Sequence, residues 1–355
     1  KDGYDITSGI ADIGGPQLPP AAYTVAEIQL HHTPRVNQWQ DKAAFGLMFE
    51  YQSVPTPATT NSIDPKNVID LTTLMQADGN ISWTAPPGNW SIIRFGFSLT
   101  GQQNGPAPPE LTGFEVDKMN ATYVNNYLDK YLQPYMDAIG PLYGEKGLQY
   151  LLLDSWEANL QNWTDEMLAE FSRRNGYDAR PYLPVLTGRV IGSADISDRF
   201  LWDYRNTISD LITDKHYKTI SEYAHKKGIK LYGEAIGAAL GTMGEGLRSK
   251  GMVDIPMGEF WTEADSKLRQ EHPSDILEAA SAAHIYNKTI VAAESFTDIK
   301  RPFGPPSFLK YLADYYMTLG VNRFVIHTSV HQPLDDKKPG FTLAIFGQHY
   351  TRHNT

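Results

Sequence analysis

Short apolar segments that end in acidic residues and are followed by a helical pattern limit the possible folds of this chain more than any other feature. The first example, residues 147–163, opens with apolar residues at 148 and 150–153, a run that has the length of a strand and is apolar on both faces. Such a run is typical of a parallel strand buried between two layers. It ends at Asp154 and Glu157, and Thr164 then provides a typical helix N-cap. This order of strand, acid and helix predicts one parallel α/β unit.

The same order occurs at four further places along the chain. The expected strands lie at 229–232, 252–256, 289–293 and 323–326, and the residues that follow them are Glu234, Glu259, Glu294 and His327, in that order. The expected helices lie at 164–175 and 195–227 and after the caps Ser274 and Ser307, with Gly176, Gly228 and Gly320 at helix ends. Another helix is expected around tyrosines 123, 127, 131 and 135, whose spacing places them on one face.

Strands that alternate with helices predict a parallel sheet with right-handed crossovers. The predicted fold is therefore an α/β (β/α)8 TIM-type barrel, complete or incomplete, because five clear units are fewer than the eight of a closed barrel. Residues 1–40 are expected to form the N-terminal part of the barrel, and 111–355 its main catalytic region. Residues 41–110 are expected to form a small all-β insertion, with strands at 45–51, 81–84 and 90–99 and a turn at Pro86-Pro87-Gly88-Asn89.

Composition excludes several classes of function. The 41 acidic residues exceed the 31 lysines and arginines and give a net charge of −10, and no dense basic segment indicates a nucleic-acid partner. No apolar run approaches the roughly 20 residues of a membrane-spanning helix. Cysteine is absent, which excludes disulfides and thiol catalysis but leaves the cellular compartment open.

The acidic residues at the strand ends point to one functional cluster. In a βα barrel the carboxyl ends of all strands meet at one face, where the active site lies. Any one of these acids alone is more simply a solvated loop residue or a helix cap, but their repeated position favours a shared role. Glycoside hydrolysis needs two carboxyl groups, one of them protonated, and repulsion together with apolar neighbours supplies that proton by raising a pKa. Surplus carboxylates can hold a hard cation such as Ca²⁺.

The residues of this cluster suggest different roles. Glu294 is the candidate general acid because it follows an apolar segment and precedes Phe296. Glu259 and Glu157 compete for the role of the base, and the one not used would be a cation ligand or a sugar-binding group. The remaining candidates for substrate binding are Asp154, Glu234, His327, Trp156 and Trp261. The alternatives are a core role for His327 and simple packing for the two indoles.

Several segments resemble glycoside hydrolase family 106, the α-L-rhamnosidases. The resemblance covers nearly the whole chain and rests on Gly14-Gly15-Pro16, Ile69-Asp70-Leu71-Thr72, Trp83-Thr84-Ala85-Pro86-Pro87-Gly88-Asn89-Trp90, Arg94-Phe95-Gly96, Gly113-Phe114-Glu115-Val116-Asp117-Lys118, Asp154-Ser155-Trp156-Glu157, Gly176-Tyr177-Asp178, Gly258-Glu259-Phe260-Trp261 and Ala293-Glu294-Ser295. It implies a barrel interrupted by β-structure, an inverting mechanism, a Ca²⁺ ion at the sugar and flanking β-sandwich domains. It also implies a secreted enzyme, periplasmic or extracellular, that releases terminal α-L-rhamnose from plant or bacterial polysaccharides.

Two alternatives remain open beside this interpretation. One is a retaining glycosidase on a related barrel, in which Glu157 or Glu259 would be the nucleophile for another sugar. The other is a barrel fragment that binds glycans without catalysis. The family's expected segment before Gly14 is missing and the chain stops at Thr355. If the chain is a fragment, we expect it to aggregate or to be weakly active when expressed alone, since an unclosed sheet exposes its edges.

Overall fold

The structure is a computed structural model that describes most of the chain from residue 62 onward. The described residues are 4–5, 62–105, 107–142, 144–158, 160–236, 244–262, 268–299, 305–328, 330–338, 340–341, 343, 347 and 350. The chain divides into two compact units, the first formed by residues 1–120 and 160–211 and the second by 121–159 and 212–355. The boundaries expected from the sequence, at residues 40 and 110, stay a prediction.

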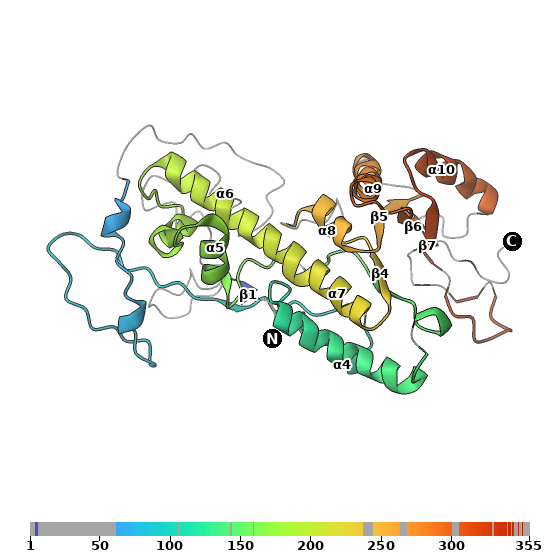
Figure 1. The fold of residues 1–355 in the computed structure, drawn as a ribbon, viewed down its shortest axis with the longest axis horizontal. Coiled ribbons are helices and arrows are strands. Elements are labelled where there is room, and N and C mark those ends of the chain that lie inside the picture. Colours follow the sequence, from blue (N-terminus) through green and yellow to red (C-terminus); the bar gives the residue numbers. More distant parts are fainter. Residues whose placement is uncertain are drawn as a thin grey trace. The chain divides into compact units, whose positions relative to one another are not determined.

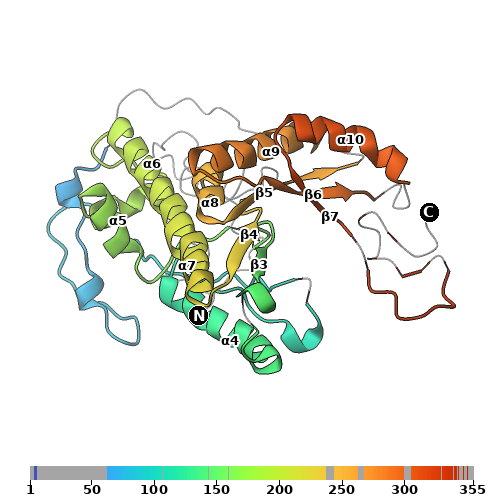
Figure 2. The ribbon, with the colours of Figure 1, turned by 45° about the vertical axis from the view of Figure 1, so that its right-hand side comes forward.

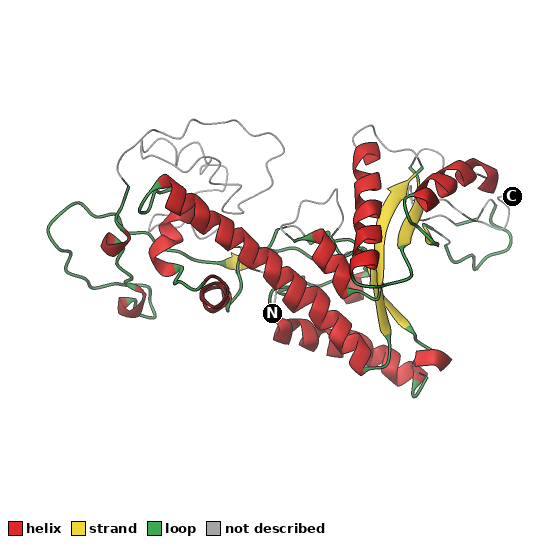
Figure 3. Ribbon diagram, turned by 45° about the horizontal axis from the view of Figure 1, so that its top comes forward, coloured by secondary structure: helices red, strands yellow, loops and turns green. Residues whose placement is uncertain are grey.

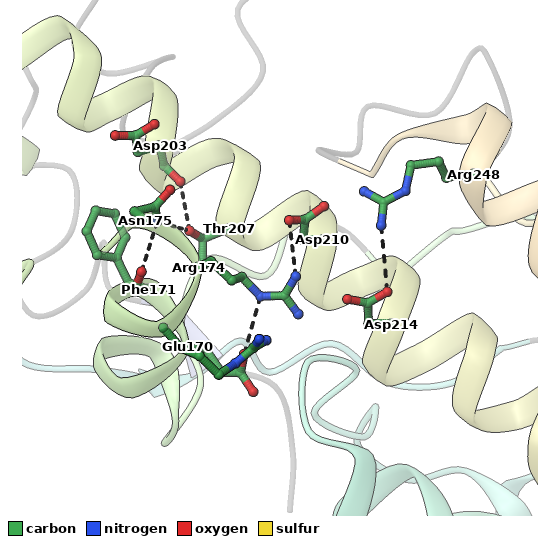
Figure 4. Close-up of polar contacts among 10 residues, drawn as sticks. Glu170, Phe171, Arg174, Asn175, Asp203, Thr207, Asp210, Asp214 and Arg248 are labelled. Atoms are coloured by element: carbon green, nitrogen blue, oxygen red, sulfur yellow. Dashed lines mark hydrogen bonds and ion pairs between the residues drawn. The ribbon is translucent and has the colours of Figure 1, made fainter. Parts of the chain in front are cut away.

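The first unit is built around two helices, α5 (Met167–Asn175) and α6 (Ala194–Leu211). Figure 4 shows how polar side chains join them: the Arg174 guanidinium lies 3.3 Å from Glu170 and 3.1 Å from Asp210, and the Asn175 amide donates to the Thr207 hydroxyl. Gly176 ends α5 at a φ of 78°, as its position in the sequence predicts.

The predicted cap of α5 is wrong. Thr164 lies two residues before the N-cap, which is Glu166, and its hydroxyl instead donates to the buried carboxylate of Asp117 at 2.8 Å. A long-range partner has therefore replaced the local hydrogen bond that Thr164 would make as a cap.

The region expected to be a β-insertion contains little regular strand in its described part. β2 (Ser98–Leu99) pairs antiparallel with β1 (Tyr4–Asp5), and Met75 and Ile81 form an isolated bridge. Short 3₁₀ helices occupy Pro65–Asn67 (η2), Thr72–Leu74 (η3) and Pro109–Leu111 (η4). The expected strands at 81–84 and 90–99 are therefore wrong except at the Ile81 bridge and at Ser98–Leu99. The expected strand at 45–51 lies outside the described residues and stays a prediction.

The second unit contains the parallel sheet (Figures 1 and 2). Its strands are β3 (Tyr150–Leu153), β4 (Lys230–Gly233), β5 (Ile255–Trp261), β6 (Ala292–Thr297) and β7 (Arg323–Ile326), and they neighbour one another in sequence order. All four pairings are parallel. The five predicted parallel strands and the mixed α/β class are thereby confirmed. The sheet curls as part of a barrel does, and in the described residues it is not closed into eight strands.

Helices flank this sheet (Figure 3). They are α4 (Ala121–Ile139), α7 (Lys218–Lys226), α8 (Gly246–Met252), α9 (Leu268–Ile285) and α10 (Pro306–Thr318), with a π-helical segment, η7 (Ile212–Tyr217), before α7. Two predicted helix starts are wrong, because Ser274 lies inside α9 and Ser307 inside α10. The predicted long helix at 195–227 is confirmed as helical, interrupted by the π segment.

The helix α4 buries a different face from the row of tyrosines. Its buried residues are Val124, Leu128 and Leu132, which pack with α7 and β4, whereas the tyrosines at 127, 131 and 135 remain 45–48% exposed. The three rings instead contact one another, with centroids 5.9 and 5.5 Å apart. Aliphatic residues at the same helical spacing therefore form the packed stripe.

The two faces of the sheet have different roles. Leu151, Leu231 and Phe260 belong to the clusters that pack against α4, α7, α9 and α10. Residues on the other face of the strands, among them Tyr232 and Met257, form a separate small cluster. Because side chains alternate along a strand, every second residue in the C-terminal direction continues this second face.

None of the described helices is both long and apolar enough to cross a membrane.

Candidate active site

The alternation of side chains brings the predicted acids to the face opposite the helices. Tyr232, Met257, Ala292 and Val325 lie on that face, and Glu234, Glu259, Glu294 and His327 each follow one of them by two residues. Tyr150 is on the same face four residues before Asp154. Glu259 and Glu294 are direct partners in the β5–β6 pairing. The sheet thus gathers the acidic residues predicted at its strand ends, all of them in the second unit.

Two of these acids lie inside strands rather than after them. The sequence placed Glu259 and Glu294 beyond strand ends, whereas β5 continues to Trp261 and β6 to Thr297. The acids still lie near the carboxyl end of the sheet, where the last residues of β5 and β6 pair across a register shift.

Glu234 is the most deeply buried acid of the group. Its side chain is 1% exposed, and neither carboxylate oxygen has a hydrogen-bond partner among the described residues. Burial raises the pKa of Glu234 well above its ordinary value, and the nearby charges of Glu294, Glu259 and Asp154 raise it further. A charged carboxylate that is buried without hydrogen bonds destabilises the fold unless a proton or a cation compensates its charge.

Glu259 and Glu294 share an intermediate environment. Burial raises the pKa of each to about 7, with a further contribution from the charge of Glu294 on Glu259 and of Asp154 on Glu294. A carboxyl group with a pKa near neutrality can either hold or accept a proton at working pH, which is the property of a general acid or base.

A hydrogen-bonded chain connects Glu294 to His327 through Thr297. The Thr297 hydroxyl donates to Glu294 Oε1 at 3.2 Å and lies 2.9 Å from His327 Nδ1. Since the hydroxyl has a single proton, it can accept from Nδ1–H while it donates to Glu294. Burial lowers the pKa of His327, and the bond from Thr297 stabilises the charged form of Glu294.

The loop after β3 provides the exposed part of the site. Asp154 and Glu157 are both exposed; Asp154 accepts from the Ser155 amide at 3.0 Å, and Glu157 accepts from the Ser155 hydroxyl at 3.3 Å. Trp156, between them, is only 5% exposed and its ring packs edge-on against His216. Packing, one of the two roles considered for Trp156, is therefore what its position favours, while Trp261 is half-buried at the end of β5.

Three of the acids are close enough together to ligate one metal ion. Asp154, Glu234 and Glu294 each offer a carboxylate oxygen, and these oxygens lie within 4.8 Å of one another. Two ligands on opposite sides of a Ca²⁺ ion are about 5 Å apart, so the spacing suits that ion. The donors are all oxygen, as a hard cation requires, and the unpartnered oxygens of buried Glu234 give it a direct reason to bind there. The expected ligands Glu157 and Glu259 are not in this group and stay a prediction.

Sequence reasoning missed three polar residues that hold the site. Thr297 connects Glu294 to His327, Asp275 accepts from the Glu259 amide, and Lys250 donates to the Glu234 carbonyl. Thr297 lies three residues after Glu294, and its role could have been predicted only if β6 had been known to continue to Thr297. Lys250 and Asp275 lie on helices, where the sequence gives no signal that their side chains point toward the sheet.

Comparisons with known proteins agree on a glycosidase family. The family model described as alpha-L-rhamnosidase, glycoside hydrolase family 106, matches residues 11–355. The structure of a rhamnosidase from Novosphingobium sp. PP1Y superposes with a TM-score of 0.84 at 44% identity, over 90% of this chain and 31% of that chain. A Formosa agariphila protein named "Putative beta-glucuronidase" is 36% identical over 309 residues, 87% of this chain and 25% of that protein. The chain thus spans about a quarter to a third of the length of these two proteins.

Proposed function

The chain belongs to glycoside hydrolase family 106, and from this premise we propose that its cluster of carboxyl groups hydrolyses terminal α-L-rhamnosides with inversion of configuration. The observation that carries the proposal is the pair of carboxyl groups with pKa values near 7, Glu259 and Glu294, within one group of acids on a single face of the sheet. A protonated carboxyl group beside charged ones is the requirement of glycosidic bond cleavage.

Glu294 is the proposed general acid. Its raised pKa lets it hold a proton near neutral pH, and the Thr297–His327 chain fixes its orientation. Glu157 is the proposed base, because an exposed carboxylate on a loop has direct access to the attacking water. Glu259, which is more deeply buried, then contributes a hydrogen bond to the sugar or a cation ligand.

A Ca²⁺ ion is proposed at Asp154 and Glu234, whose carboxylate oxygens lie within 4.8 Å of each other, and Glu294 beside them keeps its proton as the general acid. When bound there, the ion supplies positive charge that orients sugar hydroxyls and offsets the repulsion of the acids. The protein's own groups deliver the proton and activate the water.

The charge of the site favours a neutral sugar over a uronic acid. A glucuronide would bring another carboxylate to a face that already carries Asp154, Glu157, Glu234, Glu259 and Glu294, and like charges at short range repel. Rhamnose is neutral and avoids this repulsion. We therefore prefer a rhamnoside as substrate over the glucuronide in the name of the Formosa protein.

The decisive experiment compares substrates with good and poor leaving groups. Glu294→Gln should remove most activity on natural rhamnosides and much less on activated aryl rhamnosides, because a good leaving group needs little protonation. Glu157→Gln and Glu259→Gln serve as matched comparisons. Equal loss of the Glu294 variant on both substrates would assign the acid role elsewhere, and a selective loss on poor leaving groups in Glu157→Gln would exchange the two roles.

Two further measurements separate the alternatives. NMR of the first product distinguishes inversion from the retaining mechanism, and sugar binding without turnover would favour a glycan-binding module. EDTA should abolish turnover and Ca²⁺ should restore it, whereas Mg²⁺ should do so poorly because it requires a smaller octahedral shell. Full activity after exhaustive chelation would contradict the proposed cation site.

We also propose that the protein is periplasmic or extracellular and that flanking β-sandwich domains accompany this chain.

A further inference from the structure

The side chain of Lys250 is a fully buried charge next to the strands that carry the acids. It comes from α8 and is 0% exposed, and its ammonium group donates to Glu234 O at 2.6 Å and to Met257 O at 2.9 Å. The third contact is an ion pair with Asp275 Oδ1 at 2.9 Å, and Glu278 Oε2 lies farther away at 4.0 Å. The two contacts to carbonyl oxygens are hydrogen bonds, whereas Asp275 Oδ1 interacts with the ammonium through its charge, since no described residue donates a hydrogen bond to it.

Asp275, on α9, extends this arrangement to the next acid. While its Oδ1 faces Lys250, its Oδ2 accepts a hydrogen bond from the backbone amide of Glu259 at 2.9 Å. Gly258 makes this approach feasible, because a Cβ atom at that position would lie 2.7 Å from Oδ2. The two buried charges thus bind the backbone of both acid-bearing strands.

These contacts occur where the sheet itself provides none. The β4–β5 pairing covers Tyr232 with Ile255 and Gly233 with Pro256, and the next pair in this register would be Glu234 with Met257. At this next position the Lys250 ammonium instead donates hydrogen bonds to the carbonyl oxygens of Glu234 and Met257. The side chains replace the backbone hydrogen bonds between the two strands at the end that carries the acids.

We propose that Lys250 and Asp275 are positioning residues that fix the separation of the acid-bearing ends of β4 and β5, and thereby place Glu234 and Glu259. The effect on catalysis rests on the proposed glycosidase function. Neither residue reaches the substrate in this role, and both act through the backbone of the acids. Since catalytic groups must be held to within a fraction of an ångström, loss of the pair should lower kcat more than it raises KM.

The test uses a double variant, Lys250→Met with Asp275→Asn. Each single substitution leaves one buried charge without its partner and is expected to destabilise the chain strongly. The double variant leaves neither charge and should recover much of that stability. If Lys250 and Asp275 only compensate each other's charge, kcat of the double variant should recover together with its stability. If they position the strands, kcat should stay at least tenfold below that of the wild type.

Lys288→Met is the matched control. Lys288 also binds backbone carbonyls, those of Gly251 and Val253, but at the C-terminal end of α8, before β5 begins and away from the acids. It should lower stability and leave kcat unchanged. Gly258→Ala, which displaces Asp275 while keeping both charges, provides a second test that does not depend on folding of the double variant. It is expected to reduce kcat in the same way.

Amide hydrogen exchange over residues 255–261 gives a result independent of activity. The proposal requires faster exchange there in the double variant and in Gly258→Ala, and wild-type exchange in Lys288→Met. Wild-type kcat and exchange in the folded double variant, or in Gly258→Ala, would overturn it. An inactive wild type would instead refute the proposed function, and the exchange experiment would still decide the positioning role.

Discussion

Replacement of Glu259 by glutamine should stabilise the chain at alkaline pH. The folded state raises the pKa of Glu259 to about 7 from its ordinary value of 4.5, because its charged form is buried among other carboxylates. Between these two values the folded state therefore binds more protons than the unfolded state. The free energy of unfolding therefore falls as the pH rises from 4.5 to about 7, and above pH 7 the whole contribution of the protonated Glu259 has been lost. Glutamine has nearly the same shape and never carries the charge.

The size of the effect follows from the difference in pKa. At about 1.36 kcal/mol per pKa unit, a rise from 4.5 to about 7 corresponds to about 3 kcal/mol at pH 8 and to almost nothing below pH 4.5. This is an upper limit, because the charge of Glu294 contributes to the raised pKa of Glu259 and a buried amide also needs hydrogen-bond partners. We expect a gain of about 1–3 kcal/mol at pH 8, and about 2–4 °C in Tm per kcal/mol for a unit of this size.

The assay is thermal and urea unfolding of the wild type and Glu259→Gln in EDTA at pH 5 and pH 8. Chelation is needed because a bound cation would stabilise the charged wild type. Glu157→Gln is the control, since an exposed residue at the same site should change stability by less than about 0.5 kcal/mol. The reasoning would be refuted by equal stability of Glu259→Gln and wild type at pH 8. An equal gain at both pH values would also refute it, since that gain would come from packing.

Three other substitutions test local features of the strand ends. Gly233→Ala should cost more than about 2 kcal/mol in urea unfolding, since its Cβ would lie 2.3 Å from the Leu153 carbonyl oxygen, and a smaller cost would show that β3 and β4 can separate. Ala235→Gly should raise stability by up to about 1 kcal/mol, because Ala235 has a φ of 56°, and a loss would contradict strain there. Thr297→Val should move the pH–rate limb of Glu294 to higher pH, because it removes the bond that stabilises the charged carboxylate; an unchanged limb would exclude that bond.

The positions of the acids could be predicted from the sequence because alternation along a strand is strict. Once Tyr232 and Met257 are placed on the face opposite the helices, Glu234 and Glu259 must lie on the same face. The sequence therefore identified the acids that the sheet gathers. It did not locate the ends of β5 and β6, which continue past the acids because pairing between them extends to Trp261 and Thr297.

Helical side chains were harder to predict for a physical reason. Several faces of a helix can satisfy the same spacing, so the row of tyrosines in α4 did not show that Val124, Leu128 and Leu132 form the buried face. Likewise a lysine such as Lys250 is ordinarily exposed, and its burial becomes understandable only when Asp275 and two carbonyls surround it. Local hydrogen-bonding rules failed at Thr164, whose hydroxyl found the distant Asp117.

The strain and repulsion at the strand ends have a common consequence for cation binding. Glu234 is buried without a partner among the described residues, and Ala235 and Phe296, which follow the acids of β4 and β6, both have positive φ values. These features destabilise the folded state in the absence of a counter-charge, and the packed cores between sheet and helices must offset them. A cation bound to Asp154 and Glu234, beside Glu294, reduces the repulsion without changing the backbone. Stability and cation affinity should therefore be linked, with the added stability equal to RT ln(1 + [Ca²⁺]/Kd), about 2.7 kcal/mol at a hundredfold excess over Kd. In Glu234→Gln both quantities should change together, the fold becoming more stable without Ca²⁺ and gaining less from it. A variant that gains stability in EDTA and yet keeps the full Ca²⁺ increment would show that Glu234 is not a ligand.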